Sequence, residues 1–185
     1  MPVLAEKQRL FTVDEYRAMG WAGILTPDER VELIDGLIIP MSPIGDPHVD
    51  CVNHLTRLFV LRTDPKAIVS VQNPVRLNDY TEPEPDVVLI RPNKAGVPNA
   101  EDVLLLVEVA DTTLAFDRDI KLPRYAAAGI PEVWIVALEE DCLEVYRKPG
   151  ATGYAEERSF GRGEAVSIEA LPAAGAFAVD AMLRP

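Results

Sequence analysis

An almost unbroken apolar run, Val103-Leu104-Leu105-Leu106-Val107-Glu108-Val109, constrains the fold more than any other part of the sequence. A strand with one face in water alternates apolar and polar residues, whereas a strand covered on both faces is apolar throughout. The run therefore predicts a central strand with a packed layer on each side. The chain has 185 residues, 48% of them hydrophobic and 26% charged, which is enough for one core of this kind.

Shorter segments with helix or strand signals surround this run and predict a mixed α/β chain. Thr12 followed by Glu15 is a capping-box pattern that begins a helix over residues 13–19. Asp35-Gly36 between two apolar segments is typical of a tight hairpin turn, here over residues 30–39. Further helices are expected at about 48–62, because Pro47 delays the start to His48, and from about Lys121 to Gly129. Further strands are expected at residues 67–77, 86–90, 133–137, 142–147, 154–160 and 165–168.

Two acidic residues stand among apolar neighbours. Asp86 opens the strand 86–90, and Glu108 lies near the end of the central run, on the face it shares with Leu104, Leu106 and Ala110. A buried carboxylate costs several kcal/mol unless it is paired, bound to metal or protonated. If the two strands pair antiparallel, the two carboxylates meet at one end of the sheet, and a divalent cation is the usual reason to tolerate their repulsion.

Each acid also has a purely structural interpretation. Asp86 alone is typical of a solvated turn, and Glu108 could form a salt bridge with Arg118 or Lys121, the next basic side chains downstream. Pro123 is tolerated only in a first helical turn, so the regular helix is expected to begin near Lys121. That start places Lys121 at the helix entrance, close to the end of the sheet that carries Glu108.

The charge of the chain narrows the classes of function. A formal net charge of −12 argues against sequence-blind binding of nucleic acid through a broad basic surface, and it suits a hard divalent cation held by carboxylates. No apolar run reaches the roughly 18 residues that span a bilayer. The first ten residues, MPVLAEKQRL, contain no continuous apolar segment typical of a secretory signal, and two isolated cysteines suit a reducing compartment. We therefore expect a cytoplasmic protein without a membrane segment.

Several segments in combination carry a family resemblance. They are Val31-Glu32-Leu33-Ile34-Asp35-Gly36, the helix opening at His48, Glu84-Pro85-Asp86-Val87-Val88, Leu106-Val107-Glu108-Val109-Ala110, then Asp117, Lys121 and Tyr125, and Ala128-Gly129-Ile130-Pro131-Glu132-Val133-Trp134-Ile135-Val136. In this order and spacing they resemble the Uma-two family, which belongs to the PD-(D/E)xK nuclease superfamily of restriction-endonuclease-like proteins. The likeness covers roughly residues 10–145.

The resemblance implies an α/β fold of the α+β type, with a restriction-endonuclease-like core, a mixed central sheet flanked by helices, and extra antiparallel strands. It implies one domain over residues 1–185, with the core at about 10–145 and C-terminal strands and a tail at 142–185. Asp86, Glu108 and Glu32 are carried over as metal ligands. The superfamily pattern places a lysine two positions after Glu108, where this chain has Ala110, and the family's lysine on the following helix is Lys121 here.

The implied activity is hydrolysis of DNA phosphodiester bonds with Mg²⁺, for which Mn²⁺ could substitute. The acids would hold the cation, Lys121 would stabilise the attacking water or the transition state, and His48 and Gln72 are accessory candidates. A homodimer is expected, since two-fold symmetry suits cleavage of two strands. The choice between DNA and RNA, and between single and double strands, stays open.

Two other classes of function also fit the sequence. One is a non-catalytic nuclease-fold module for interaction or nucleic-acid binding, with the acids kept as structural pairs. The other is a homo-oligomeric scaffold that uses its C-terminal strands and the apolar tail from Ala173 to Leu183 as its interface. Trp21 and Trp134 are predicted to be packing residues rather than platforms for base stacking.

Overall fold

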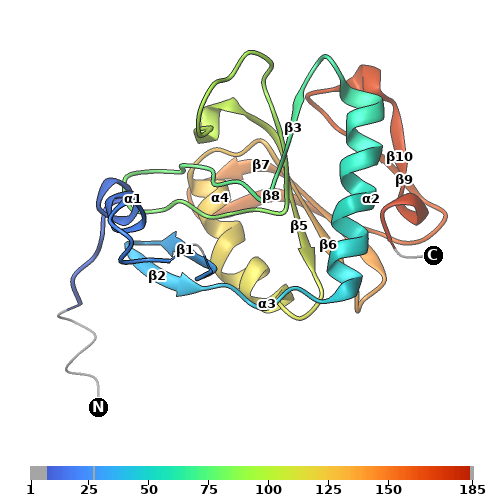
Figure 1. The fold of residues 1–185 in the computed structure, drawn as a ribbon. Coiled ribbons are helices and arrows are strands. Elements are labelled where there is room, and N and C mark those ends of the chain that lie inside the picture. The colour runs from blue at the N-terminus through green and yellow to red at the C-terminus, as the bar shows by residue number, and fades with distance from the viewer. Residues whose placement is uncertain (1–7, 27, 184–185) are drawn as a thin grey trace.

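A computed structural model describes residues 8–26 and 28–183. Most of residues 1–10, the segment in which no signal-like apolar run was found, therefore lies outside the described residues. The predicted mixed α/β fold with a mixed central sheet is confirmed (Figure 1). The helices are α1 (Val13–Trp21), α2 (Asp46–Thr63), α3 (Leu114–Phe116) and α4 (Leu122–Ala127), with a π-helical turn (Asp117–Lys121) between the last two. The strands are β1 (Val31–Ile34), β2 (Leu37–Pro40), β3 (Ile68–Val71), β4 (Val87–Ile90), β5 (Val103–Ala110), β6 (Glu132–Ala137), β7 (Cys142–Gly150), β8 (Gly153–Phe160), β9 (Ala165–Ser167) and β10 (Ala176–Ala178).

The main sheet has six strands in the order β3-β4-β5-β6-β7-β8. β5 and β6 run parallel, and all the other neighbours run antiparallel. The parallel pair needs a crossover, and α3, the π-helical turn and α4 supply it. The antiparallel pairing that would bring Asp86 to Glu108 is present between β4 and β5, with Val87 opposite Val107.

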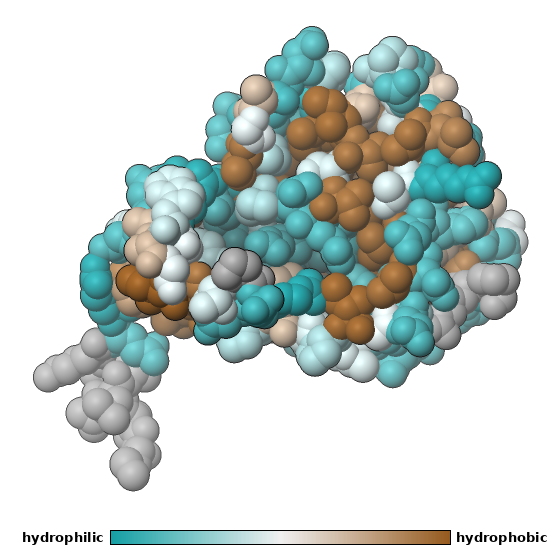
Figure 2. All heavy atoms as spheres, in the orientation of Figure 1, coloured by the Kyte–Doolittle hydropathy of each residue, from teal (hydrophilic) through white to brown (hydrophobic). Residues whose placement is uncertain are grey.

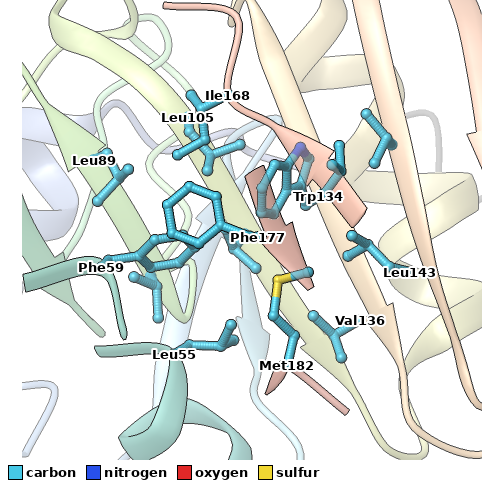
Figure 3. Close-up of a cluster of buried hydrophobic side chains, with 14 of the residues drawn as sticks. Leu55, Phe59, Leu89, Leu105, Trp134, Val136, Leu143, Ile168, Phe177 and Met182 are labelled. Carbon is cyan, nitrogen blue, oxygen red and sulfur yellow. The ribbon is translucent and has the colours of Figure 1, made fainter. Parts of the chain in front are cut away.

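Both faces of the sheet are covered, as the apolar run of β5 predicts. On one face α2 packs with the C-terminal segment, where Phe59, Trp134 and Phe177 meet with ring centroids 5.4–6.1 Å apart (Figure 3). On the other face α4 contributes Tyr125 to a second buried cluster. All eight residues of β5 are buried, so the two layers enclose it completely.

One alternation prediction is wrong. Leu104 was expected on the face of Glu108, but it packs in the α2 cluster together with Leu105. The β4–β5 register shifts at this point, since Leu89 pairs with Leu105 and Ile90 pairs with Val103. This β-bulge adds one residue to β5, so the residues before it point to the opposite faces from those that simple alternation predicts. The predicted face of Glu108 is unaffected, because Leu106 and Ala110 lie on the α4 side.

Local signals placed the N-terminal elements well. The capping box of α1 is present in both directions between Thr12 and Glu15. In the β1–β2 turn Asp35 and Gly36 have φ of 49° and 76°, as a type I′ turn requires. A Cβ at Gly36 would lie 2.6 Å from Cβ of Leu10, so the position also needs glycine for space.

Three boundary or burial predictions are wrong. α2 begins at Asp46 rather than His48, because Pro47 sits in the first turn, where its missing N–H costs nothing. The strand expected over residues 67–77 ends at Val71, since Gln72 has a φ of 49°. Trp134 is fully buried as predicted, but Trp21 is 84% exposed, because α1 buries only Val13.

The C-terminal tail is part of the core. Phe177, Val179, Met182 and Leu183 are buried against α2 and the sheet, and Arg62 of α2 lies over the ring of Phe177. These apolar side chains are therefore not available as the interface that the scaffold interpretation gave them. Within residues 8–26 and 28–183, no helix combines the length and apolar character needed to cross a membrane.

Candidate active site

A cavity of about 590 Å³ opens at the end of the sheet where β4 begins and β5 ends. The β1–β2 hairpin, the start of α2 and the α3 segment surround it, and the surface between the hairpin and α2 is hollowed and mostly hydrophilic (Figure 2). Its lining contains more carboxylates than cations. The acids are Glu32, Glu84, Asp86, Glu108, Asp111 and Asp117, and the cationic side chains are Arg30 and Lys121.

Asp86 is fixed by contacts on both of its oxygens. Its Oδ2 accepts the backbone N–H of Val109 at 2.8 Å, which ties the start of β4 to the end of β5. Its Oδ1 lies 2.9 Å from Nε2 of His48 and 3.5 Å from Nε2 of Gln72. The structure therefore brings both predicted accessory residues to Asp86, although Gln72 does not line the cavity.

Lys121 lies between the other two predicted acids. Its Nζ is 3.2 Å from Oε2 of Glu32, 3.2 Å from Oε1 of Glu108 and 4.0 Å from Oδ1 of Asp117. The side chain is buried, and it enters from the last residue of the π-helical turn, just before α4 begins. The predicted helix entrance near Lys121 is thus confirmed. Of the two proposed salt-bridge partners of Glu108, Lys121 is the one it contacts.

One oxygen of each buried glutamate is held in place. Oε1 of Glu108 accepts the Tyr125 hydroxyl at 2.5 Å as well as Lys121, and Oε2 of Glu32 accepts the backbone N–H of Glu84 at 3.2 Å as well as Lys121. The second oxygen of each has no hydrogen-bond partner within the described part of the chain. Both carboxylates are therefore oriented while keeping an oxygen for another ligand.

Burial and crowding of like charges perturb the ionisation of this cluster. Burial, and after it the charges of Asp117 and Asp86, raises the pKa of Glu108 to about 8, although the ammonium of Lys121 opposes the shift. Burial likewise raises the pKa of Asp117 to about 6. Burial alone would lower the pKa of Lys121, but Glu108, Glu32 and Asp117 outweigh it and raise that pKa well above its usual value. Lys121 is therefore cationic at neutral pH, whereas the neighbouring Glu108 holds its proton at pH 7.

The three predicted metal ligands line one cavity, but they do not form a closed ligand set. Among residues 8–26 and 28–183, the group of acidic, cysteine or histidine side chains whose donor atoms all lie within 4.8 Å of one another is Glu140, Cys142 and Glu144. That group lies outside the cavity, and Arg118 pairs with both of its glutamates. Arg118 is thus engaged away from Glu108, and the acids near Lys121 are spread around its ammonium instead.

Sequence reasoning did not single out Arg30 or Glu84 as site residues. Each stands two positions before a predicted acid, Glu32 and Asp86 respectively. Arg30 lies just before β1 and Glu84 lies before β4, so the alternation of strand faces does not place either side chain. Tyr125 appeared only within the family resemblance, and its contact with Glu108 depends on how α4 packs, for which no local signal exists.

The donor chemistry fits a hard divalent cation. The carboxylates of Asp86, Glu108 and Glu32 offer oxygen ligands of the kind that Mg²⁺ prefers, in a cavity with more acids than cationic side chains. The buried Nδ1 of His48 lacks a hydrogen-bond partner within the described residues, so the polar network around Asp86 can accept a further group. The residues present therefore suit the cation that the resemblance implies.

Two comparisons with known proteins give matches. The family model Uma2, described as "putative restriction endonuclease", matches residues 13–180. A crystal structure from Anabaena variabilis, described as "a putative nuclease belonging to DUF820", is similar with a TM-score of 0.72 and 15% sequence identity, covering 93% of this chain and 97% of that one. At this identity the likeness supports the fold alone. No curated protein matches the chain.

Proposed function

The chain belongs to the Uma2 family of restriction-endonuclease-like proteins, and from this premise we propose that it is a Mg²⁺-dependent endonuclease that hydrolyses DNA phosphodiester bonds. The observation that carries the proposal is the buried cluster at the sheet end, where Glu32, Glu108 and Asp117 surround the ammonium of Lys121 and Asp86 lies beside the end of the same strand as Glu108. A purely structural ion pair needs one acid for each base. The surplus of acids is what a cation-binding site requires.

Asp86 and Glu108 are the proposed principal ligands, and Glu32 is the third. A Mg²⁺ ion bound there would orient and acidify water and neutralise charge on the phosphate. The chain's own contribution is the fixed position of these carboxylates. The Val109 N–H holds Asp86, and the Tyr125 hydroxyl holds Glu108, so neither has to be ordered when substrate arrives.

Lys121 acts as a charge rather than as a base in this proposal. Its raised pKa keeps the side chain protonated at neutral pH, so it has no lone pair with which to take a proton from water. A preorganised ammonium in a partly dry site stabilises the negative charge that develops on the phosphoryl oxygens. Of the two roles predicted for Lys121, we therefore propose stabilisation of the transition state.

The test is metal-dependent cleavage by purified protein. Supercoiled plasmid and fluorescein-labelled DNA and RNA oligonucleotides, single- and double-stranded, are incubated with Mg²⁺, Mn²⁺ or EDTA. The parent should cleave DNA only with the metals, and Asp86→Asn and Glu108→Gln should each lower the rate by at least about 10²-fold. Asp119→Asn is the matched control, because Asp119 is an exposed acid on the same π-helical turn as Lys121.

The alternative is a non-catalytic module of the same fold. The ion pairs of Lys121 with Glu32 and Glu108 favour it, since they satisfy two of the acids within the chain. Calorimetric titration with Mn²⁺ separates the two functions. If the parent binds no Mn²⁺, only the non-catalytic role is left. The same holds if Asp86→Asn and Glu108→Gln bind Mn²⁺ as tightly as the parent does. A homodimer remains part of the proposal, to be checked by light scattering.

A further inference from the structure

Most lysines and arginines of the described chain are committed to carboxylates. Ion pairs hold Arg17, Arg118, Arg124, Arg147 and Lys121, among others. Those that form no ion pair with a described residue are Arg30, Arg57, Arg62, Lys66 and Arg91. Of these, only Arg30 lines the candidate active-site cavity.

Arg30 is held in place by its backbone and leaves most of its guanidinium unused. Its carbonyl oxygen accepts the N–H of Met41 at 2.9 Å, which fixes it at the entry of β1. Its Nη1 donates to the carbonyl oxygen of Ser42 at 3.4 Å, a long contact. A guanidinium carries five N–H donors, so most of them have no acceptor among the described residues. The side chain is exposed, at the mouth rather than the buried end.

The two cations of the cavity therefore differ in what they can bind. Lys121 is 6% exposed and shared among three carboxylates at the buried end of the cavity. Burial and the charge of Glu32 raise the pKa of Glu84, and the charge of Arg30 partly opposes that shift. Arg30 nevertheless makes no ion pair with Glu84. An anion that enters this acidic cavity meets Arg30 as its one uncommitted cation among the described residues.

Resting on the proposed function, we infer that Arg30 binds a backbone phosphate of the nucleic acid next to the phosphate that is cleaved. The planar guanidinium matches two oxygens of one phosphate, which suits it for positioning an anion. The reacting phosphate must reach Asp86 and Glu108 at the buried end. Arg30 stands at the mouth, so it meets the neighbouring phosphate and fixes where the strand enters.

The test uses binding and cleavage separately. Binding of a fluorescein-labelled oligonucleotide is followed by fluorescence anisotropy in an Asp86→Asn background, with and without Arg30→Ala, across a salt series. Arg30→Ala should weaken binding about tenfold and lower the slope of log affinity against log salt by about one. In a protein that keeps Asp86, Arg30→Ala should raise KM about tenfold and leave kcat within a few-fold of the parent value. Arg30→Lys should recover part of the lost affinity.

Arg91→Ala is the matched control, since Arg91 also forms no ion pair within the described part of the chain and follows the opposite end of β4 from Asp86. The inference is overturned if Arg30→Ala binds and cleaves like the parent, or if Arg91→Ala weakens binding as much as Arg30→Ala does. In either case, cleavage by the parent still supports the proposed function. A parent that binds DNA through Arg30 but cleaves nothing overturns the proposed function and supports the inference. A parent that neither binds nor cleaves overturns both.

Discussion

The Nζ atom of Lys121 lies 3.2 Å from Oε1 of Glu108, and both side chains are almost completely removed from water, with 6% and 3% of their surfaces exposed. A buried pair of this kind gains little over an apolar pair, but it is costly to break, because the remaining charge has lost its partner. Around Lys121 the cost is larger than for an isolated pair, since Glu32 and Asp117 depend on the same ammonium.

Lys121→Met should therefore destabilise the cation-free protein by about 3–5 kcal/mol. Urea unfolding in EDTA at about pH 9, where Glu108 is ionised, measures the effect. Adding Glu108→Gln to Lys121→Met should recover part of the loss, because the double variant removes one of the stranded carboxylates. Lys148→Met is the control: Lys148 is exposed and pairs with Glu156 at the surface, so its loss should cost less than about 0.5 kcal/mol. A loss of under 1 kcal/mol for Lys121→Met would contradict a shared buried ammonium.

Divalent cation binding should release protons. The raised pKa of Glu108, about 8, means that this acid holds its proton at pH 7 in the cation-free protein and must lose it when a cation takes its oxygens. The affinity for Mn²⁺ should therefore rise with pH from about 6 to about 8 and level off above pH 8. Titration calorimetry at pH 7 in two buffers of different ionisation enthalpy should report up to about one proton released per site. An affinity that is flat over this range, or that falls, has the wrong sign.

The Tyr125 hydroxyl should tune this ionisation. It donates to Oε1 of Glu108 at 2.5 Å and lowers the pKa of that acid, so Tyr125→Phe should move the pH at which Mn²⁺ binding develops to higher values. The lost hydrogen bond to a charged group should cost about 1.5–3 kcal/mol of stability at a pH where Glu108 is ionised. Tyr154→Phe is matched to it, since the Tyr154 hydroxyl donates to the Ile130 carbonyl on the same side of the sheet. The control should lose stability without moving the metal-binding profile, and equal shifts in both variants would refute the role of Tyr125.

Features that depend on neighbours in the sequence could be predicted, and features that depend on contacts between distant segments could not. The strand that carries Glu108 and the short strand that Asp86 opens could be predicted, because apolar runs specify them locally, whereas their antiparallel pairing was only assumed. The position of Lys121 followed from Pro123, whose backbone restriction is local as well. The faces of Leu104 and the contacts of Tyr125 could not be predicted, since a β-bulge and the packing of α4 decide them.

The same reasoning explains the misassigned tail. The residues from Ala173 to Leu183 are apolar, and an apolar segment must be covered, but the sequence does not say whether a second copy or the chain's own sheet covers it. In the structure Phe177 reaches Phe59 on α2 and Trp134 on β6, elements more than 40 residues earlier in the chain. Its burial is a property of the complete fold rather than of the segment.

Phe177→Ala should consequently behave as a core truncation. Phe177 is fully buried between two aromatic rings, with Arg62 above its own ring, so its removal leaves a cavity and should cost about 3–5 kcal/mol in urea unfolding. Leu61→Ala is the control, because Leu61 on α2 is 73% exposed and its truncation should change stability by less than about 0.5 kcal/mol. Light scattering under folding conditions should show the same mass for the parent and for Phe177→Ala, since the ring faces the protein's own core. A variant of normal stability that dissociates an oligomer would instead restore the tail as an interface.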